Sequence, residues 1–228
     1  MPKPHLAAVI LAFASLTLSA GPTDPSGGAA RLFADKGAPK GWSVRAWDDL
    51  AKEAPADAKW LVDDNGVLHG SDPRGTWLIS EKEYGDFVLE LDFKIPAHGN
   101  SGVALRCPMH GDPAFDGMEL QIVDPRYYDG KGDPDQLTGS LYKAVAPAKQ
   151  AFRPEQWNHY QITCRGSRVK VILNGDAIQD VDLDDQKKQL EKGSPLKDRP
   201  RRGHIGFQEL SRDGHVQIRN ATLQPLDK

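Results

Sequence analysis

Residues 117–124, "GMELQIVD", carry two side chains that could act directly on a substrate. Glu119 and Gln121 alternate with apolar residues, which is the pattern of a half-buried strand whose polar side chains share one face. A carboxylate can take a proton from carbon or oxygen, and an amide can bind a hydroxyl group. The segment therefore predicts a general base beside a hydrogen-bonding group. The apolar positions, expected in the core, are Met118, Leu120 and Ile122.

A second carboxylate, Asp124, follows five residues after Glu119, a spacing that resembles the catalytic strand of retaining β-glucanases. Retaining hydrolysis needs two carboxyl groups about 5–5.5 Å apart. Residues five apart point to opposite faces of a regular strand, and the strand is expected to end before Pro125. The pattern therefore argues against a conventional glycosidase and indicates a single carboxylate beside an amide.

The same alternation in two other segments adds polar side chains to this face. In 101–107 it points Arg106 away from the core, and in 203–208 it does the same for His204 and Gln208. Such groups suit the hydroxyls of a sugar. They would equally suit the solvent-exposed face of any β-sandwich, and the residue pattern alone leaves both readings open.

Period-two alternation dominates the chain, so the elements that position these residues are expected to be strands. Two further strands within 167–183 meet at Asn174–Gly175, a strong hairpin signal. The fold class predicted is all-β, an antiparallel two-sheet β-sandwich or jelly roll. Short helices are expected at 44–53 and 184–193. The strands are expected at 65–70, 75–80, 87–95, 101–107, 118–123, 157–166, 203–210 and 215–223.

The longest irregular stretch, 125–138, is rich in Asp, Gly, Pro and Tyr, and long ordered loops are often functional. Tyr127 and Tyr128 could stack on the apolar face of a sugar ring. The acidic residues could hold a calcium ion, although the spacing is not that of an EF-hand. No other metal or cofactor is predicted.

Length and charge restrict the remaining choices. The 228 residues carry a formal charge of −3, which gives no basic excess for nucleic acid. The first twenty residues resemble a signal peptide cleaved near Ala20, and their apolar run is too short to span a bilayer. The prediction is export to the periplasm or secretion, a spacer at 21–30 and one domain at 31–228. In an oxidising compartment Cys107 and Cys164 could pair, or both could be buried thiols.

The order and spacing of several segments resemble a known family. They are "LFADKGAPKGW", "EYGDFVLELDFKIPAHGNSGVALR", "GMELQIVD", "TGSLYKAVAP", "QWNHYQITCRGSRVKVILNG", "GHIGFQEL" and "VQIRNATL". Together they resemble the bacterial 3-keto-disaccharide hydrolase domain, which has a concanavalin A-like jelly roll. The resemblance implies a glycoside already oxidised at C3, a base that removes the C2 proton, elimination of the C1 substituent and addition of water. It also implies a functional link to a sugar 3-oxidoreductase.

The resemblance suggests roles for individual residues. Glu119 is expected to be the base and Arg106 the group that stabilises the oxyanion or binds a hydroxyl. A family turn containing Asp-His-Gly is replaced here by "QELSRDGHV", which leaves His215 as its nearest histidine. The alternative function is a non-catalytic, lectin-like carbohydrate-binding domain. The expected substrate-binding residues are Asn100, Gln121, Asp124, Tyr127, Tyr142, His204 and Gln208.

Overall fold

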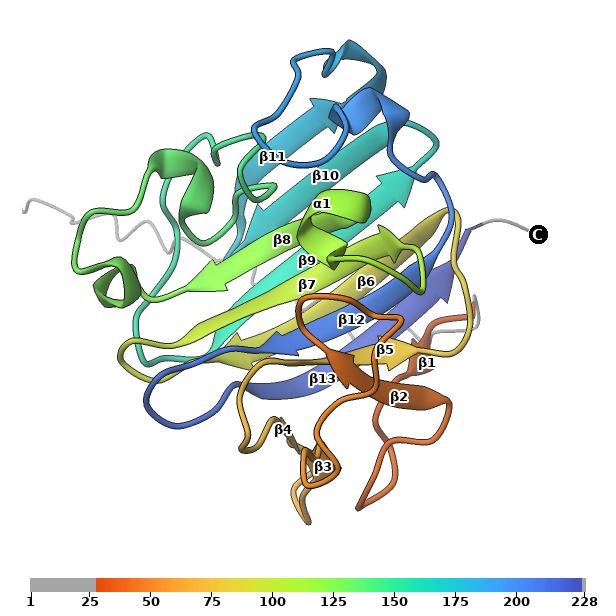
Figure 1. Cartoon of the computed structure of the whole chain (residues 1–228), viewed down its shortest axis with the longest axis vertical. Helices are drawn as coiled ribbons and strands as arrows, with labels where there is room; N and C mark the ends of the chain where they lie inside the picture. Colours follow the sequence, from red (N-terminus) through yellow and green to blue (C-terminus); the bar gives the residue numbers. More distant parts are fainter. Residues whose placement is uncertain (1–27, 227–228) are drawn as a thin grey trace, which may run out of the picture.

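The computed structural model describes residues 28–226, which form two antiparallel sheets stacked face to face (Figure 1). The larger sheet has eight strands in the order β11-β10-β9-β6-β13-β4-β3, with β1 also paired to β13. Its strands are β1 (Ala30–Arg31), β3 (Leu61–Val62), β4 (Leu68–His69), β6 (Phe87–Lys94), β9 (Asn158–Arg165), β10 (Arg168–Leu173), β11 (Asp176–Asp182) and β13 (Gln217–Pro225).

The smaller sheet has five strands in the order β2-β5-β12-β7-β8. The order brings distant parts of the chain together, because β12 lies between β5 and β7. This arrangement confirms the predicted antiparallel sandwich. The strands are β2 (Trp42–Ala46), β5 (Thr76–Ser80), β7 (Asn100–Cys107), β8 (Met118–Val123) and β12 (His204–Glu209).

The core lies between the two sheets and follows the alternation in the sequence. In β6, Phe87, Leu89, Leu91 and Phe93 are fully buried while the residues between them are half-buried. Burying each such side chain stabilises the fold by about 1.5–3 kcal/mol relative to leaving it exposed. The larger sheet therefore has one dry face and one wet face, as an antiparallel sheet can.

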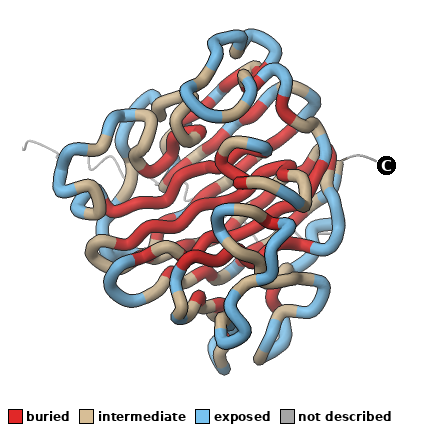
Figure 2. The backbone as a smooth tube through the Cα atoms, viewed as in Figure 1, coloured by how far each residue is buried: buried red, intermediate tan, exposed pale blue. Residues whose placement is uncertain are grey.

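The smaller sheet is different, because β7, β8 and β12 are buried at every position (Figure 2). Their inner face packs in the core, so their outer face must be covered by other parts of the chain. A second, small apolar cluster on that face includes Leu50, Trp77 and Ala104. The short helix α1 (Pro113–Asp116) also lies over β7 and β8. Polar residues of these strands are thus enclosed rather than solvated.

The strand predictions were confirmed and the two helix predictions were wrong. Asn174 and Gly175 both have positive φ angles, 54° and 89°, as the turn of a tight hairpin requires. Segment 44–53 begins instead as strand β2, which pairs with β5. Segment 184–193 offers one apolar residue, Leu190, and so has no apolar stripe to bury as a helix. Only single 3-10 turns form around it, η3 (Leu183–Asp185) and η4 (Leu196–Asp198).

The two cysteines are free and buried in separate clusters. Cys164 belongs to the main core, whereas Cys107 lies in the small outer cluster. The structure therefore agrees with two buried thiols and not with a disulfide. The predicted signal peptide and residues 21–27 of the spacer lie outside the described residues. Within residues 28–226, no helix has the length and apolar character needed to cross a membrane.

Candidate functional site

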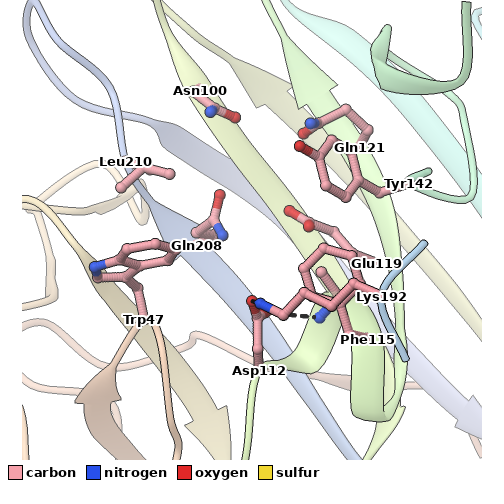
Figure 3. Close-up of a pocket in the computed structure, with 11 residues that line it drawn as sticks. Trp47, Asn100, Asp112, Phe115, Glu119, Gln121, Tyr142, Lys192, Gln208 and Leu210 are labelled. Atoms are coloured by element: carbon pink, nitrogen blue, oxygen red, sulfur yellow. Dashed lines mark hydrogen bonds and ion pairs between the residues drawn. The ribbon is translucent and has the colours of Figure 1, made fainter. Parts of the chain in front are cut away.

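A pocket of about 280 Å³ opens on the covered outer face of the smaller sheet (Figure 3). This is just below the range of about 300–1,000 Å³ for small-molecule sites, and it is large enough for a single sugar ring. Five of the predicted site residues line it: Asn100, Glu119, Gln121, Tyr142 and Gln208. Six further residues line the pocket that no sequence pattern predicted: Trp47, Asp112, Ala114, Phe115, Lys192 and Leu210.

Strand register brings the polar residues of the floor together. Gly102 of β7 pairs with Gln121 of β8, and Ala104 of β7 pairs with Glu119. On the other side of β7, Gly206 of β12 pairs with Ala104. Because β7 contributes only small side chains here, the longer side chains of its two neighbours can extend over it. The alternation in the sequence therefore placed Glu119, Gln121 and Gln208 correctly on this face.

Glu119 is the most unusual group of the floor. The residue is 4% exposed, and its Oε1 atom has no hydrogen-bond partner in the described structure. Burial raises the pKa of this carboxyl well above its usual value, and the negative charge of Asp112 raises it further. A buried polar group without a partner is costly. Such groups with perturbed pKa values are concentrated at functional sites.

Two amide side chains lie near Glu119 on the same face. Gln121 accepts a hydrogen bond from the Ile122 backbone N–H at 2.9 Å, and its Nε2 lies 3.5 Å from the Tyr128 hydroxyl. The side-chain oxygen of Asn100 is buried without a partner. Amides can both donate and accept, so these side chains can bind hydroxyl groups of a neutral ligand.

One wall of the pocket is built from α1 and the segment that packs against it. Asp112 begins α1, and its Oδ1 accepts a hydrogen bond from the Ala114 backbone N–H at 3.1 Å. Its Oδ2 lies 3.3 Å from Nζ of Lys192, which in turn lies 4.1 Å from the centre of the Phe115 ring. Asp112 is a second carboxylate in the pocket; it comes from the start of α1 and not from the strand whose sequence predicts a single carboxylate beside an amide. "DPAF" was readable as a helix start, with Asp before Pro, but not as part of a pocket.

Aromatic side chains complete the walls. The Tyr142 backbone N–H donates to the carbonyl oxygen of Glu119 at 2.9 Å, which fixes Tyr142 beside β8. Its ring meets the Phe115 ring edge to face, with centres 6.1 Å apart. Trp47 lies on the opposite side of the pocket and is 43% exposed (Figure 3). Exposed aromatic faces of this kind suit the apolar faces of sugars.

Arg106 is not in the pocket. Its φ angle of 52° breaks the alternation of β7, and a register irregularity in the β7–β12 pairing lies beside it. The fully buried side chain donates to Gly85 O and Gly166 O, both at 2.7 Å, and to Asp86 at 3.1 Å. The prediction that Arg106 contacts the substrate's developing charge is therefore wrong about where this side chain points.

Three other predicted binding residues also lie outside the pocket. Asp124 binds the Arg126 side chain at 2.7 and 2.8 Å and begins the 3-10 turn η1 (Pro125–Tyr128). Nδ1 of His204 donates to Ser80 O at 2.7 Å, at the far end of β12 from Gln208. The third residue, Tyr127, does not line the pocket, and the centre of its ring lies 4.5 Å from the Arg212 guanidinium.

Two further expectations concern His215 and the loop 125–138. Nδ1 of His215 lies 3.7 Å from Glu209, and the histidine does not line this pocket. Tyr128, the neighbour of Tyr127, reaches the pocket edge through its contact with Gln121. Among residues 28–226, no three or more His, Cys, Asp or Glu side chains are grouped in a way that could hold a metal ion. Calcium binding by this loop stays a prediction.

The fold defines a class, the lectin-like antiparallel β-sandwiches, and this chain has a pocket on the outer face of its smaller sheet. Within that class, the chain belongs to the family described as the 3-keto-alpha-glucoside-1,2-lyase-like domain, whose model matches residues 28–224. The family resemblance noted in the sequence is thereby confirmed. A comparison with curated proteins finds no match.

Solved structures agree with this class. A protein from Parabacteroides distasonis ATCC 8503, provisionally named a glycosyl hydrolase, is 25% identical with a TM-score of 0.72; the match covers 87% of this chain and 99% of that one. The carbohydrate-binding module CBM66 from Bacillus subtilis is 16% identical with a TM-score of 0.50, covering 81% and 95%. The module shares the fold alone. Family and first relative together support a glycosyl-hydrolase-like enzyme.

Proposed function

We propose that this protein cleaves 3-keto-glycosides by elimination, with Glu119 as the base that removes the C2 proton. The observation that carries the proposal is the Glu119 carboxyl itself, enclosed in a pocket of sugar size with one oxygen unpartnered and a raised pKa. A base is most effective when its pKa lies near the working pH, and an ordinary exposed glutamate is too acidic for that. Burial raises the pKa of Glu119 and so moves it toward the working pH.

The reaction proceeds in three steps: proton removal at C2, loss of the C1 substituent and addition of water. Glu119 takes the proton from C2, which the C3 carbonyl makes acidic, and the C–H electrons form a C2=C3 enolate. The electrons then return to rebuild the carbonyl and form a C1=C2 double bond, while the C1–O bond breaks and the released oxygen takes a proton from water. Glu119 gives its proton to the hydroxide that remains, which restores the base. Addition of water across C1=C2 afterwards gives the free 3-keto sugar. The elimination step agrees with the lyase chemistry in the family's description.

The second carboxylate does not convert the site to double displacement. Both oxygens of Asp112 have partners, the Ala114 backbone N–H and the Lys192 ammonium. A retaining hydrolase needs a free carboxylate nucleophile facing C1 and an acid opposite it. The unpartnered Glu119 is better suited to proton abstraction. Gln121, Asn100 and Gln208 are assigned to the hydroxyls that orient the ring.

The test compares an ordinary aryl glucoside with its 3-keto derivative and measures release of the aryl alcohol. We expect release only from the keto form, and a loss of at least about 100-fold in Glu119→Gln, within the usual contribution of a general base. Glu81→Gln, a matched change at an exposed glutamate, is the control. Release from the ordinary glucoside by the parent protein, or full activity of Glu119→Gln, would refute the proposal.

The second candidate is a carbohydrate-binding domain without catalysis. It is favoured by the half-exposed Trp47 at the pocket mouth, which is typical of binding sites for sugars. Calorimetric binding of a 3-keto-glycoside with no release by the parent protein would support this candidate over the enzyme. Under either function we propose an exported protein whose ligand is a sugar, and for the enzyme a sugar 3-oxidoreductase that supplies the substrate.

A further inference from the structure

We infer that Lys192 is the cation that holds the negative charge on the C3 oxygen when Glu119 removes the C2 proton. This inference rests on the proposed function and adds a residue to it. Removal of a proton next to a ketone places charge on the ketone oxygen, and a preorganised donor at that oxygen is a large contribution to such catalysis. Since Arg106 is buried elsewhere, the pocket needs another cation, and Lys192 lines it.

The ion pair between Lys192 and Asp112 places a cation at the pocket wall and contributes little to folding stability. Figure 3 shows its side chain passing over Phe115 toward Asp112, with the ammonium 3.3 Å from the Asp112 carboxylate. The Lys192 side chain is 61% exposed, and ion pairs at that exposure contribute little to folding stability. The pair does hold the ammonium at the pocket wall, 4.1 Å from the centre of the Phe115 ring.

The backbone that carries Lys192 is held in place by a buried arginine. Arg199 is 3% exposed and donates to Ser194 O at 3.0 Å and to Ala114 O and Gly117 O at 2.8 Å. It thus joins the segment after Lys192 to both ends of the helix that carries Phe115. Burial lowers the pKa of Arg199 to about 10, so placing this charge here is costly. The cost is understandable if the segment must sit at one position on α1.

Gly193 makes this close docking feasible. Its φ angle is +76°, and a Cβ atom there would come within 2.5 Å of the carbonyl oxygen of Phe115. Only glycine adopts this conformation at such close range without strain. Lys192 is therefore presented from a backbone that is packed on α1, although the segment around it has no regular secondary structure.

The proposed step is balanced without any proton transfer from Lys192. The C2 proton moves to Glu119, the C–H electron pair forms C2=C3, and the C3 oxygen becomes negative. The Lys192 ammonium donates a hydrogen bond to this oxygen and keeps all its protons. When the electrons return to form C1=C2 and the C1–O bond breaks, the C3 oxygen becomes a neutral carbonyl again, and the Lys192 ammonium still donates to it.

The experiment uses two probes, so that the enolate step is separated from bond cleavage. Exchange of the C2 hydrogen is followed in D₂O on methyl 3-keto-glucoside, and release of nitrophenol is followed on p-nitrophenyl 3-keto-glucoside. Lys192→Gln should lower both rates by about 100-fold or more, the usual effect of removing one such donor. Lys192→Arg should retain most of both rates because it keeps the charge. Lys188→Ala, an exposed lysine of the same segment, is the control, and melting temperatures should match.

The outcomes separate this inference from the function on which it rests. If Lys192→Gln keeps both rates while Glu119→Gln loses them, Lys192 has no role and the proposed function stands. If Lys192→Gln exchanges C2 hydrogen normally but fails to release nitrophenol, the enolate role is overturned. If the parent protein neither exchanges nor releases, the proposed function fails and the inference fails with it.

Discussion

The carboxyl group of Glu119 in β8 lies directly over the backbone of Gly102 in the neighbouring strand β7. A Cβ atom added at Gly102 would overlap Oε1 of Glu119 and come within 2.8 Å of its Cγ. Gly102 thus leaves the space that the candidate base occupies. Gln121, which pairs with Gly102, lies on the same face one step further along β8.

Gly102→Ala should therefore remove activity by displacing the carboxyl group, not by unfolding the sheet. We expect release of the leaving group to fall by about 100-fold, comparable to loss of a general base. The added methyl fits strand geometry, so the melting temperature should change by only a few degrees, equivalent to about 1 kcal/mol. In the Glu119→Gln background the same change should cause almost no further loss. Independent, additive losses would contradict the steric relationship.

Glu119→Gln should make the protein more stable above about pH 4.5, the usual pKa of a glutamate in an unfolded chain. Burial raises the pKa of Glu119 in the folded state, so its contribution is fully present below that pH and is lost as pH rises through the folded pKa. The amide cannot ionise and avoids this loss. We expect a gain of about 1–3 kcal/mol at the higher pH, the range for a buried unpartnered group. Thermal unfolding from pH 4 to 8 should show that the free energies of unfolding of the parent and of Glu119→Gln become equal at the acidic end. A stability difference that does not change with pH would contradict this assignment.

Activity of the parent protein should increase with pH, whereas the stability contribution of Glu119 decreases. Glu119 can accept a proton only when ionised, so kcat/KM should rise with pH through the raised pKa. The measurement is a pH profile of nitrophenol release, with Asp112→Asn as a comparison. Because the charge of Asp112 helps to raise the Glu119 pKa, the profile of this variant should move toward lower pH. A shift in the opposite direction would exclude the coupling.

Cys107 and Cys164 should be unreactive in the folded protein. Burial raises the pKa of each thiol to about 12, which suppresses the thiolate that reacts. A thiol reagent should label neither side chain in native buffer and both after denaturation. Reducing agent should not change the melting temperature, since no disulfide contributes to it. Failure to label both thiols after denaturation without reductant would contradict the free state of both.

The fold and the pocket floor could be predicted because both depend on local alternation. Strand period decides which side chains enter the core, and the same period put Glu119, Gln121 and Gln208 on one enclosed face. The wall could not be predicted in this way. Asp112 and Lys192 are eighty residues apart. Their meeting depends on α1 and a buried arginine, which no periodic pattern records.

Arg106 shows how a single backbone angle defeats the alternation rule. At φ 52° its side chain leaves the face that the sequence pattern assigns to it. Positive φ is uncommon for residues other than glycine, and asparagine, aspartate and histidine are the usual exceptions. An arginine at this position therefore did not indicate a positive φ angle. The error mattered because the same residue had been expected to be the cation of the site.

Arg106→Ala should destabilise the protein strongly while leaving the chemistry intact. Its guanidinium joins β7 to Gly85, Asp86 and Gly166, and removing it leaves two carbonyl oxygens without their donor. We expect a loss of about 3 kcal/mol, as for other broken buried networks, and a melting temperature lower by about 6–12 °C. At temperatures well below the transition, kcat and KM should remain near those of the parent, as they should in the control Arg165→Ala at an exposed position. If Arg106→Ala keeps the parent's melting temperature but loses activity, Arg106 has a catalytic role and the structural assignment is wrong.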